Sequence, residues 1–220
     1  MTTPHYSVVI ATPGHSMKSE YVKSLIKTCA HLDKLNLSYF FLNKYSSFVP
    51  TARELTALDS DRHDYSSNKI GGGKFTYDKI FWIDSDIEWE PEDFMKLYMS
   101  NLSVLSGLYQ IDELGSLACQ IPNKDGAPTR VNKVEFLLHD EPIQVGGVGF
   151  GFLAVKRGVF ESIDRPWFLI NRVQWAVDNP IKVNVGEDYS WCANAIRSGF
   201  QIWVDPLVKV KHHKETVWEV

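Results

Sequence analysis

Cysteine is scarce in this chain of 220 residues, which has only three, Cys29, Cys119 and Cys192. Their number is odd and no two of them form a CxxC pair, which argues against both a disulfide framework and a zinc knuckle. Such cysteine usage is typical of a reducing compartment. We therefore expect a cytoplasmic protein.

Long apolar runs and an excess of basic charge are also lacking. No run approaches the roughly 20 residues that span a bilayer, and residues 1–6 lack the basic and apolar regions of a signal peptide. Lys and Arg total 23 against 27 Asp and Glu, which gives a net charge of −4. We therefore expect no membrane span, and the lack of a basic stripe argues against nucleic-acid binding.

Strands and helices alternate in the first half of the chain. Apolar residues recur at three- and four-residue steps from Met17 to Leu35, which predicts an amphipathic helix. Short β-branched or apolar runs predict strands at 6–11, 38–42 and 79–83, and further helices are expected at 52–58 and from Pro91. The polar, glycine-rich stretch 59–74 is predicted to be a mobile loop. This order predicts an α/β fold with a parallel, doubly wound sheet, whose ligands bind outside the carboxyl ends of the strands.

The second half has strand-like runs with few helices between them. These runs lie at 104–109, 131–138, 143–145, 150–155, 201–204 and 208–211, and one last helix is expected from Glu187 to Gly199. We interpret them as antiparallel or mixed additions to the same sheet. No linker marks a boundary, so residues 1–220 are expected to form one domain, which could be part of a longer polypeptide.

Two carboxylates follow the third predicted strand, in Asp84-Ser85-Asp86. Carboxylates this close repel each other unless a cation or hydrogen-bond donors neutralise them. Mg²⁺ and Mn²⁺ take carboxylate oxygens together with substrate phosphates, so this turn suits a metal-diphosphate complex. The alternative is a solvated acidic turn, since short motifs also occur by chance.

Two histidines follow the last predicted strand, His212 and His213. Adjacent side chains of a strand point to opposite faces, so one imidazole at most faces a given site. We favour His212 as a third metal ligand, which would suit Mn²⁺ better than Mg²⁺. His213 stays open as the ligand, and so does the simpler interpretation of two surface histidines beside lysines.

Three further features have both a structural and a functional interpretation. The glycine-dense run 146–151 indicates either a bulge or a close approach of backbone to a ligand. Glu187 and Asp188 either stabilise the dipole of the last helix or direct a carboxylate at sugar hydroxyls. Arg53 either pairs with a phosphate or with Asp84, or is a solvated surface charge.

Taken together and in this order, Ala11-Thr12-Pro13-Gly14, Thr51-Ala52-Arg53, Phe81 to Asp86, the 146–151 turn, Gly186-Glu187-Asp188 and Val210 to His213 resemble a GT-A-type glycosyltransferase. The sequence is most similar to the small glycosyltransferase domain of chlorella-infecting large DNA viruses, which is linked to capsid-protein glycosylation. The resemblance covers essentially the whole chain. It implies a Rossmann-like domain with a central mixed, mostly parallel sheet, a nucleotide-binding half over about 1–110 and an acceptor half over about 111–220. If the chain is virus-encoded, the expected location is the host cytoplasm.

The resemblance also implies a role for individual residues. Thr12, Pro13 and Gly14 would line the nucleoside pocket with Arg53 nearby, and Asp84 and Ser85 would face the ribose or the metal. Asp86 and His212 would hold Mn²⁺, or Mg²⁺, against the diphosphate, with Asp84 as a further ligand. Gly147 would approach the donor sugar, and Asp188, with Glu187 beside it, would be catalytic. The implied donor is a UDP-sugar, glucose or a deoxyhexose, and the acceptor a glycan or glycoprotein.

Two other functions stay open from the sequence. A strand followed by DxD also resembles haloacid-dehalogenase-type phosphatases, in which the first Asp is a nucleophile. Those enzymes usually carry the motif on their first strand, and no GDxxxD pair follows here. The other alternative is a catalytically silent sugar-binding domain, although this chain retains both Asp84 and Asp86.

Overall fold

The computed structural model describes residues 2–63, 66–122, 128–132, 136, 138–173 and 183–214. Its first half alternates strands and helices as predicted: β1 (His5–Ala11), α1 (Ser19–Lys34), β2 (Tyr39–Leu42), α2 (Val49–Leu58), β3 (Thr76–Ile83), β4 (Ile87–Glu88), α3 (Pro91–Met99) and β5 (Val104–Leu108). Its second half contains β6 (Ser116–Pro122), β7 (Pro128–Asn132), β8 (Ile143–Val145), β9 (Gly147–Val148), β10 (Phe152–Lys156), β11 (Asn171–Val173), β12 (Val183–Val185), α5 (Glu187–Arg197), β13 (Ile202–Lys209) and β14 (Lys211–His212).

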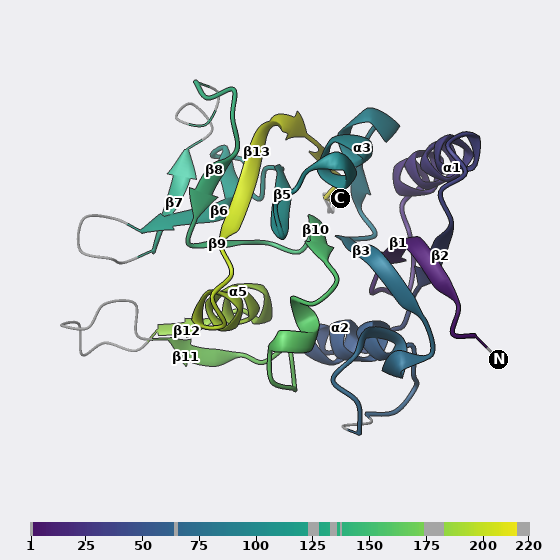
Figure 1. Cartoon of the computed structure of the whole chain (residues 1–220). Helices are drawn as coiled ribbons and strands as arrows, with labels where there is room; N and C mark the ends of the chain where they lie inside the picture. Colours follow the sequence, from purple (N-terminus) through teal and green to yellow (C-terminus); the bar gives the residue numbers. More distant parts are fainter. Residues whose placement is uncertain are drawn as a thin grey trace, which may run out of the picture.

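The central sheet has seven strands in the order β2-β1-β3-β10-β5-β13-β8 (Figure 1). β1 pairs in parallel with β2 and β3, and β13 pairs in parallel with β5. β10 is antiparallel to both β3 and β5, and β8 is antiparallel to β13. The α/β class and the mixed, mostly parallel sheet predicted from the sequence are confirmed, because β2, β1, β3, β5 and β13 run in one direction.

Helices cover both faces of the sheet, because alternate strand residues point to opposite sides. Val8 and Ile10 of β1 share one apolar cluster with residues of α1 and α3. Val9 and Ala11 share the other cluster with residues of α2 and α5. Figure 1 shows these two helix pairs on opposite sides of the strands. The sheet is thus the buried middle layer, and its carboxyl edge stays free for a site.

Several element boundaries differ from those predicted. α2 begins at Val49, earlier than the predicted 52, because Pro50 fits the first turn of a helix, whose amides have no intrahelical partner. The strand predicted at 201–204 and the start of the one predicted at 208–211 belong to a single strand, β13, with a bulge between Asp205 and Lys209, and Lys211 begins β14. The last helix ends at Arg197, and Gly199 follows it with a positive φ of 90°, as expected of a glycine after a helix.

Other parts of the second half were predicted incompletely. β6, β9, β11 and β12 were not predicted. Of the strand predicted at 131–138, residues 131–132 belong to β7, and the described residues Phe136 and Leu138 lie outside any strand. Residues 133–135 and 137 are outside the described part of the chain.

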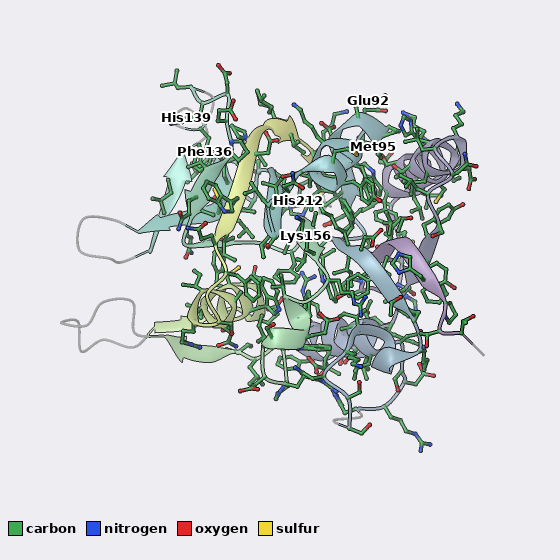
Figure 2. The ribbon with its side chains drawn as sticks, in the orientation of Figure 1. Glu92, Met95, Phe136, His139, Lys156 and His212 are labelled. Carbon is green, nitrogen blue, oxygen red and sulfur yellow. The ribbon has the colours of Figure 1, made fainter. Side chains whose placement is uncertain are left out.

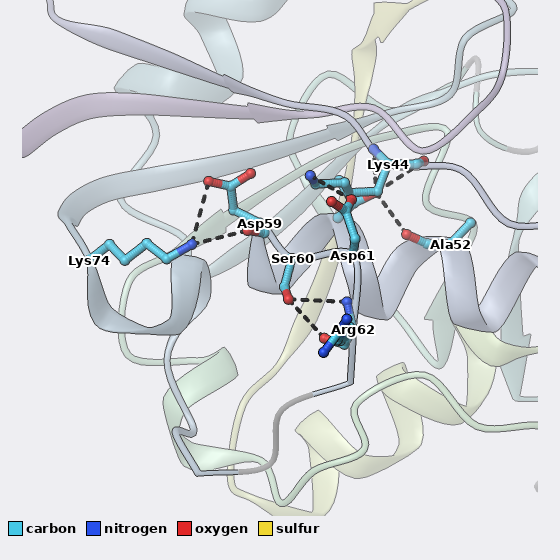
Figure 3. A network of polar contacts seen from close by, with 8 residues as sticks. Lys44, Ala52, Asp59, Ser60, Asp61, Arg62 and Lys74 are labelled. Atoms are coloured by element: carbon cyan, nitrogen blue, oxygen red, sulfur yellow. Dashed lines mark hydrogen bonds and ion pairs between the residues drawn. The ribbon is translucent and has the colours of Figure 1, made fainter.

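The stretch 59–74, predicted to be a mobile loop, contains a short 3-10 helix at Ile70–Gly73. Ile70 is buried in the same apolar cluster as residues of α2, so this part of the stretch packs against the hydrophobic core. Figure 3 shows its polar contacts: Lys74 donates to the Asp59 carbonyl, Lys44 pairs with Asp61, and the Ser60 hydroxyl bonds the backbone of Arg62. Residues 64–65 lie outside the described residues.

Among the helices that the structure describes, none combines the length and the apolar character needed to cross a bilayer.

Candidate functional site

A cleft opens at the carboxyl ends of β1 and β3, where the topology predicts ligand binding. Its volume is about 410 Å³, which falls in the range of small-molecule sites. Seven of the residues predicted for the site line it: Pro13, Gly14, Arg53, Asp84, Ser85, Asp86 and His212. The fold therefore brings together residues from the start, the middle and the end of the chain.

Arg53 joins the first acid of the DxD turn to the last helix. Its Nη2 lies 3.1 Å from Asp84 Oδ1, and its Nε donates to Glu187 Oε1 at 3.1 Å. The Arg53 side chain is only 5% exposed, against 32% for Asp84 and 15% for Glu187. Of the interpretations left open by the sequence, pairing with Asp84 is correct and a solvated surface charge is wrong.

The surroundings of Arg53 keep it charged. Burial alone would lower the pKa of the guanidinium, but the charges of Asp84, Glu187 and Asp188 raise it. The guanidinium carbon also lies 5.3 Å from the ring centre of Phe150, a cation-π distance. Its Nη1 is buried without a hydrogen-bond partner among the described residues. Arg53 is thus a fixed positive charge beside the cleft.

Asp86 and His212 both line the cleft and are in direct contact. His212 Nε2 lies 3.1 Å from Asp86 Oδ2, and Nδ1 lies 3.0 Å from the Gln110 carbonyl oxygen. Burial alone would raise the pKa of Asp86, but the hydrogen bond from His212 lowers it, and the same bond raises the pKa of His212. β14 pairs with β4, so the two histidines point apart, and His213 bonds Glu88 instead.

These two residues have the donor chemistry for a divalent cation. Carbonyl and carboxylate oxygens only accept, so His212 donates from Nδ1 to Gln110 and from Nε2 to Asp86 in this structure. A cation bound at Nε2 would take the place of the proton there, while Gln110 would keep the proton on Nδ1. This is the outer-shell arrangement usual for a metal-ligating histidine. Within the described residues no three His, Cys, Asp or Glu side chains group closely enough to hold a metal unaided. Asp86 and His212 therefore fit a cation that takes its other ligands from phosphate and water, as Mg²⁺ does.

Asp188 is a second carboxylate with an unusual proton affinity. Burial, followed by the charge of Glu187, raises its pKa from 3.8 to about 6. Its Oδ1 accepts a hydrogen bond from the Tyr189 amide at 2.7 Å. A pKa of about 6 suits proton transfer near neutral pH, whereas Glu187 is engaged in the ion pair with Arg53.

Four predicted site residues do not line the cleft. Thr12 is fully buried and its hydroxyl bonds Tyr21 at the end of β1, so its contact with a nucleoside stays a prediction. Glu187 is connected to the cleft through its ion pair with Arg53, and Asp188 is the next residue in the sequence. Gly147 lies against α5: a Cβ added there would meet Tyr189 Cδ1 at 2.6 Å. Packing alone therefore explains the glycine at 147, and its contact with a donor sugar stays a prediction.

Several residues of the site were missed from the sequence. Asn43 Nδ2 donates to the carbonyls of Thr12 and Gly14, and so shapes the turn after β1. It follows β2 at the same sheet edge, which is the signal that could have identified it. The cleft is also lined by Tyr45, Ser46 and Ser47, which lie between β2 and α2, and by Val49 and Ala52 at the start of α2. Tyr45 is 56% exposed and meets His15 edge to face.

The fold of this chain is that of the GT-A class. No protein-family model matches the chain, and no curated protein matches it in sequence. Solved structures do match. A197 from STIV is 18% identical, with a TM-score of 0.53 over 97% of both chains. GalNAc-T7, solved with UDP, GalNAc and Mn²⁺, is 12% identical, with a TM-score of 0.54 over 94% of this chain and 43% of its own.

The viral family predicted from the sequence is also among the structural matches. A glycosyltransferase involved in glycosylation of the major capsid of PBCV-1 is 11% identical, with a TM-score of 0.37 over 70% of this chain and 62% of its own. A likeness this distant has no bearing on function. At the identities of A197 and GalNAc-T7, the likeness shows the shared GT-A fold.

Proposed function

We propose that this chain is a metal-dependent glycosyltransferase that uses a UDP-sugar. The observation that carries the proposal is the cleft at the carboxyl edge of the sheet, where Asp86 contacts His212 beside Arg53 and Asp84. The proposed cofactor is Mn²⁺, or Mg²⁺, held by Asp86 and His212. A bound cation would stabilise the negative charge that develops on a departing nucleoside diphosphate.

The chain's own residues would divide the remaining tasks. Pro13, Gly14 and Tyr45 line the part of the cleft that would take the nucleoside. Arg53 holds the Asp84 carboxylate in place, so that Asp84 and Ser85 can accept hydrogen bonds from a ribose. With a pKa of about 6, Asp188 is mostly ionised at neutral pH and suits a base that accepts the proton of an acceptor hydroxyl.

The resemblance found in the sequence supports the finer parts of the proposal. We propose UDP-glucose or a UDP-deoxyhexose as donor, a glycan or glycoprotein as acceptor, and viral capsid glycan synthesis as the setting. The phosphatase alternative is disfavoured by the ion pair between Arg53 and Asp84, because a carboxylate bound to a guanidinium is a poor nucleophile. Turnover distinguishes the transferase from a silent sugar-binding domain.

The proposal is tested by assaying a panel of UDP-sugars for hydrolysis and for transfer with Mn²⁺ present. The matched variants are Asp86→Asn, in the cleft, and Asp164→Asn, an exposed acid outside it. We expect UDP release by the wild type and by Asp164→Asn, and a loss of at least about 100-fold in Asp86→Asn. UDP release that does not depend on Mn²⁺ or on Asp86 would contradict the proposal.

A further inference from the structure

The glycine run 146–151 accommodates the side chain of Tyr109, which follows β5. A Cβ added to Gly151 would lie 2.6 Å from Tyr109 Cζ, and one added to Gly149 would collide with the Tyr109 hydroxyl. The Gly151 amide donates to that hydroxyl at 2.9 Å. Tyr109 is only 6% exposed. The glycines therefore open a slot in the protein that one buried aromatic ring fills.

Tyr109 and its neighbour hold His212 from two sides. The rings of Tyr109 and His212 meet edge to face, with centres 5.6 Å apart and planes at 90°. The carbonyl of the next residue, Gln110, bonds His212 Nδ1 at 3.0 Å. One short segment after β5 thus restricts both the tilt of the His212 ring and its rotation. His212 is labelled in Figure 2.

The same tyrosine connects to the DxD turn. The Gly151 amide donates to the Tyr109 hydroxyl. The Gly151 carbonyl accepts a hydrogen bond from the Asp84 amide at 3.1 Å. Tyr109 itself is tied to β6, since its carbonyl accepts from the Ala118 amide at 3.0 Å. Burial, and next the charge of Asp84, raise the pKa of Tyr109 well above its ordinary value, so its hydroxyl stays neutral.

We infer that Tyr109 is a positioning residue that sets the His212 ring against the Asp84–Asp86 turn and thereby tunes cation binding at Asp86 and His212. This inference rests on the proposed function, since it requires those two residues to hold a cation. Partners that orient a ligating histidine usually change metal affinity by about 10- to 100-fold when they are removed. The hydroxyl of Tyr109 accepts from Gly151 beside the DxD turn, and the ring of Tyr109 contacts His212.

The test compares Mn²⁺ binding, measured by electron paramagnetic resonance in the presence of UDP, in Tyr109→Phe and in Tyr77→Phe. Tyr77→Phe is a matched control, because the Tyr77 hydroxyl is also buried and bonds Glu161 at 3.0 Å, near the start of β3 and away from the cleft. Tyr109→Phe keeps the ring against His212 but leaves the Gly151 amide without its acceptor. We expect about tenfold weaker Mn²⁺ binding in Tyr109→Phe and unchanged binding in Tyr77→Phe.

A second measurement uses the wild-type chain alone, and so does not depend on how a variant folds. Titration of Mg²⁺ with UDP should shift the NMR signals of the Tyr109 ring and leave those of the Tyr77 ring in place. Equal Mn²⁺ affinities in the two variants, or a Tyr109 ring that does not respond to Mg²⁺, would overturn this inference alone. Failure of the wild type to bind Mn²⁺ at all would overturn the proposed function and this inference with it.

Discussion

Replacing Arg53 with methionine should destabilise the protein strongly. The substitution keeps an unbranched side chain but removes the charge that Asp84 and Glu187 each meet at 3.1 Å. Breaking a buried ion pair on one side typically costs 3–5 kcal/mol, because the remaining charge stays buried without a partner. Asp84 is 32% exposed and regains some hydration, so we expect a loss of about 3 kcal/mol, at the low end of that range.

The assay is urea unfolding at pH 8, with Lys27→Met as the matched control. Lys27 pairs with Glu90 at 2.9 Å, but both side chains are more than half exposed. Its loss should therefore cost less than about 1 kcal/mol. The cost of Arg53→Met should fall at pH 5, where Asp188, with a pKa of about 6, takes up a proton and the local negative charge decreases. Equal losses in the two variants would refute the assignment of Arg53 as the charge that holds the site together.

Two further predictions concern the last helix and the strand beside it. The folded state raises the pKa of Asp188 from 3.8 to about 6. Folding therefore disfavours the ionised carboxylate, and the protein loses stability as the pH rises from about 4 to above 6. In urea unfolding at pH 8, the free energy of unfolding of Asp188→Asn should therefore exceed that of the wild type by about 1–3 kcal/mol, and this difference should vanish near pH 4. A difference that does not change with pH would contradict this prediction. Gly147→Ala should cost about 1–3 kcal/mol by pressing on Tyr189, and the double variant with Tyr189→Leu should recover part of that loss in thermal unfolding; no recovery would contradict the packing explanation.

The sequence predicts the first half of the fold well, because its elements carry strong local patterns. β1 and β3 are buried on both faces and appear as continuous apolar runs, and α1 repeats its apolar residues at helical spacing. β6 and the short strands β11 and β12 carry no comparable pattern. They are positioned by pairing with other segments, β6 with β7 and β9, and β11 with β12.

The site was predictable only in part, for the same physical reason. Asp84 and Asp86 stand out because they end a buried strand. The partners of Arg53 do not, since Glu187 lies 134 positions further along the chain and only the fold brings the two together. The glycine run was recognised as a place of close approach, but the group that approaches Gly151 is the side chain of Tyr109, 42 positions earlier.

The proposed function requires Asp86 and His212 to hold a cation against a nucleoside diphosphate. Calorimetric titration of UDP into the wild type, Asp86→Asn and the exposed control Asp164→Asn, with and without Mn²⁺, tests it most directly. We expect UDP binding that requires Mn²⁺ in the wild type and in Asp164→Asn and is lost in Asp86→Asn. UDP binding that is equal with and without Mn²⁺, or that survives in Asp86→Asn, would contradict it.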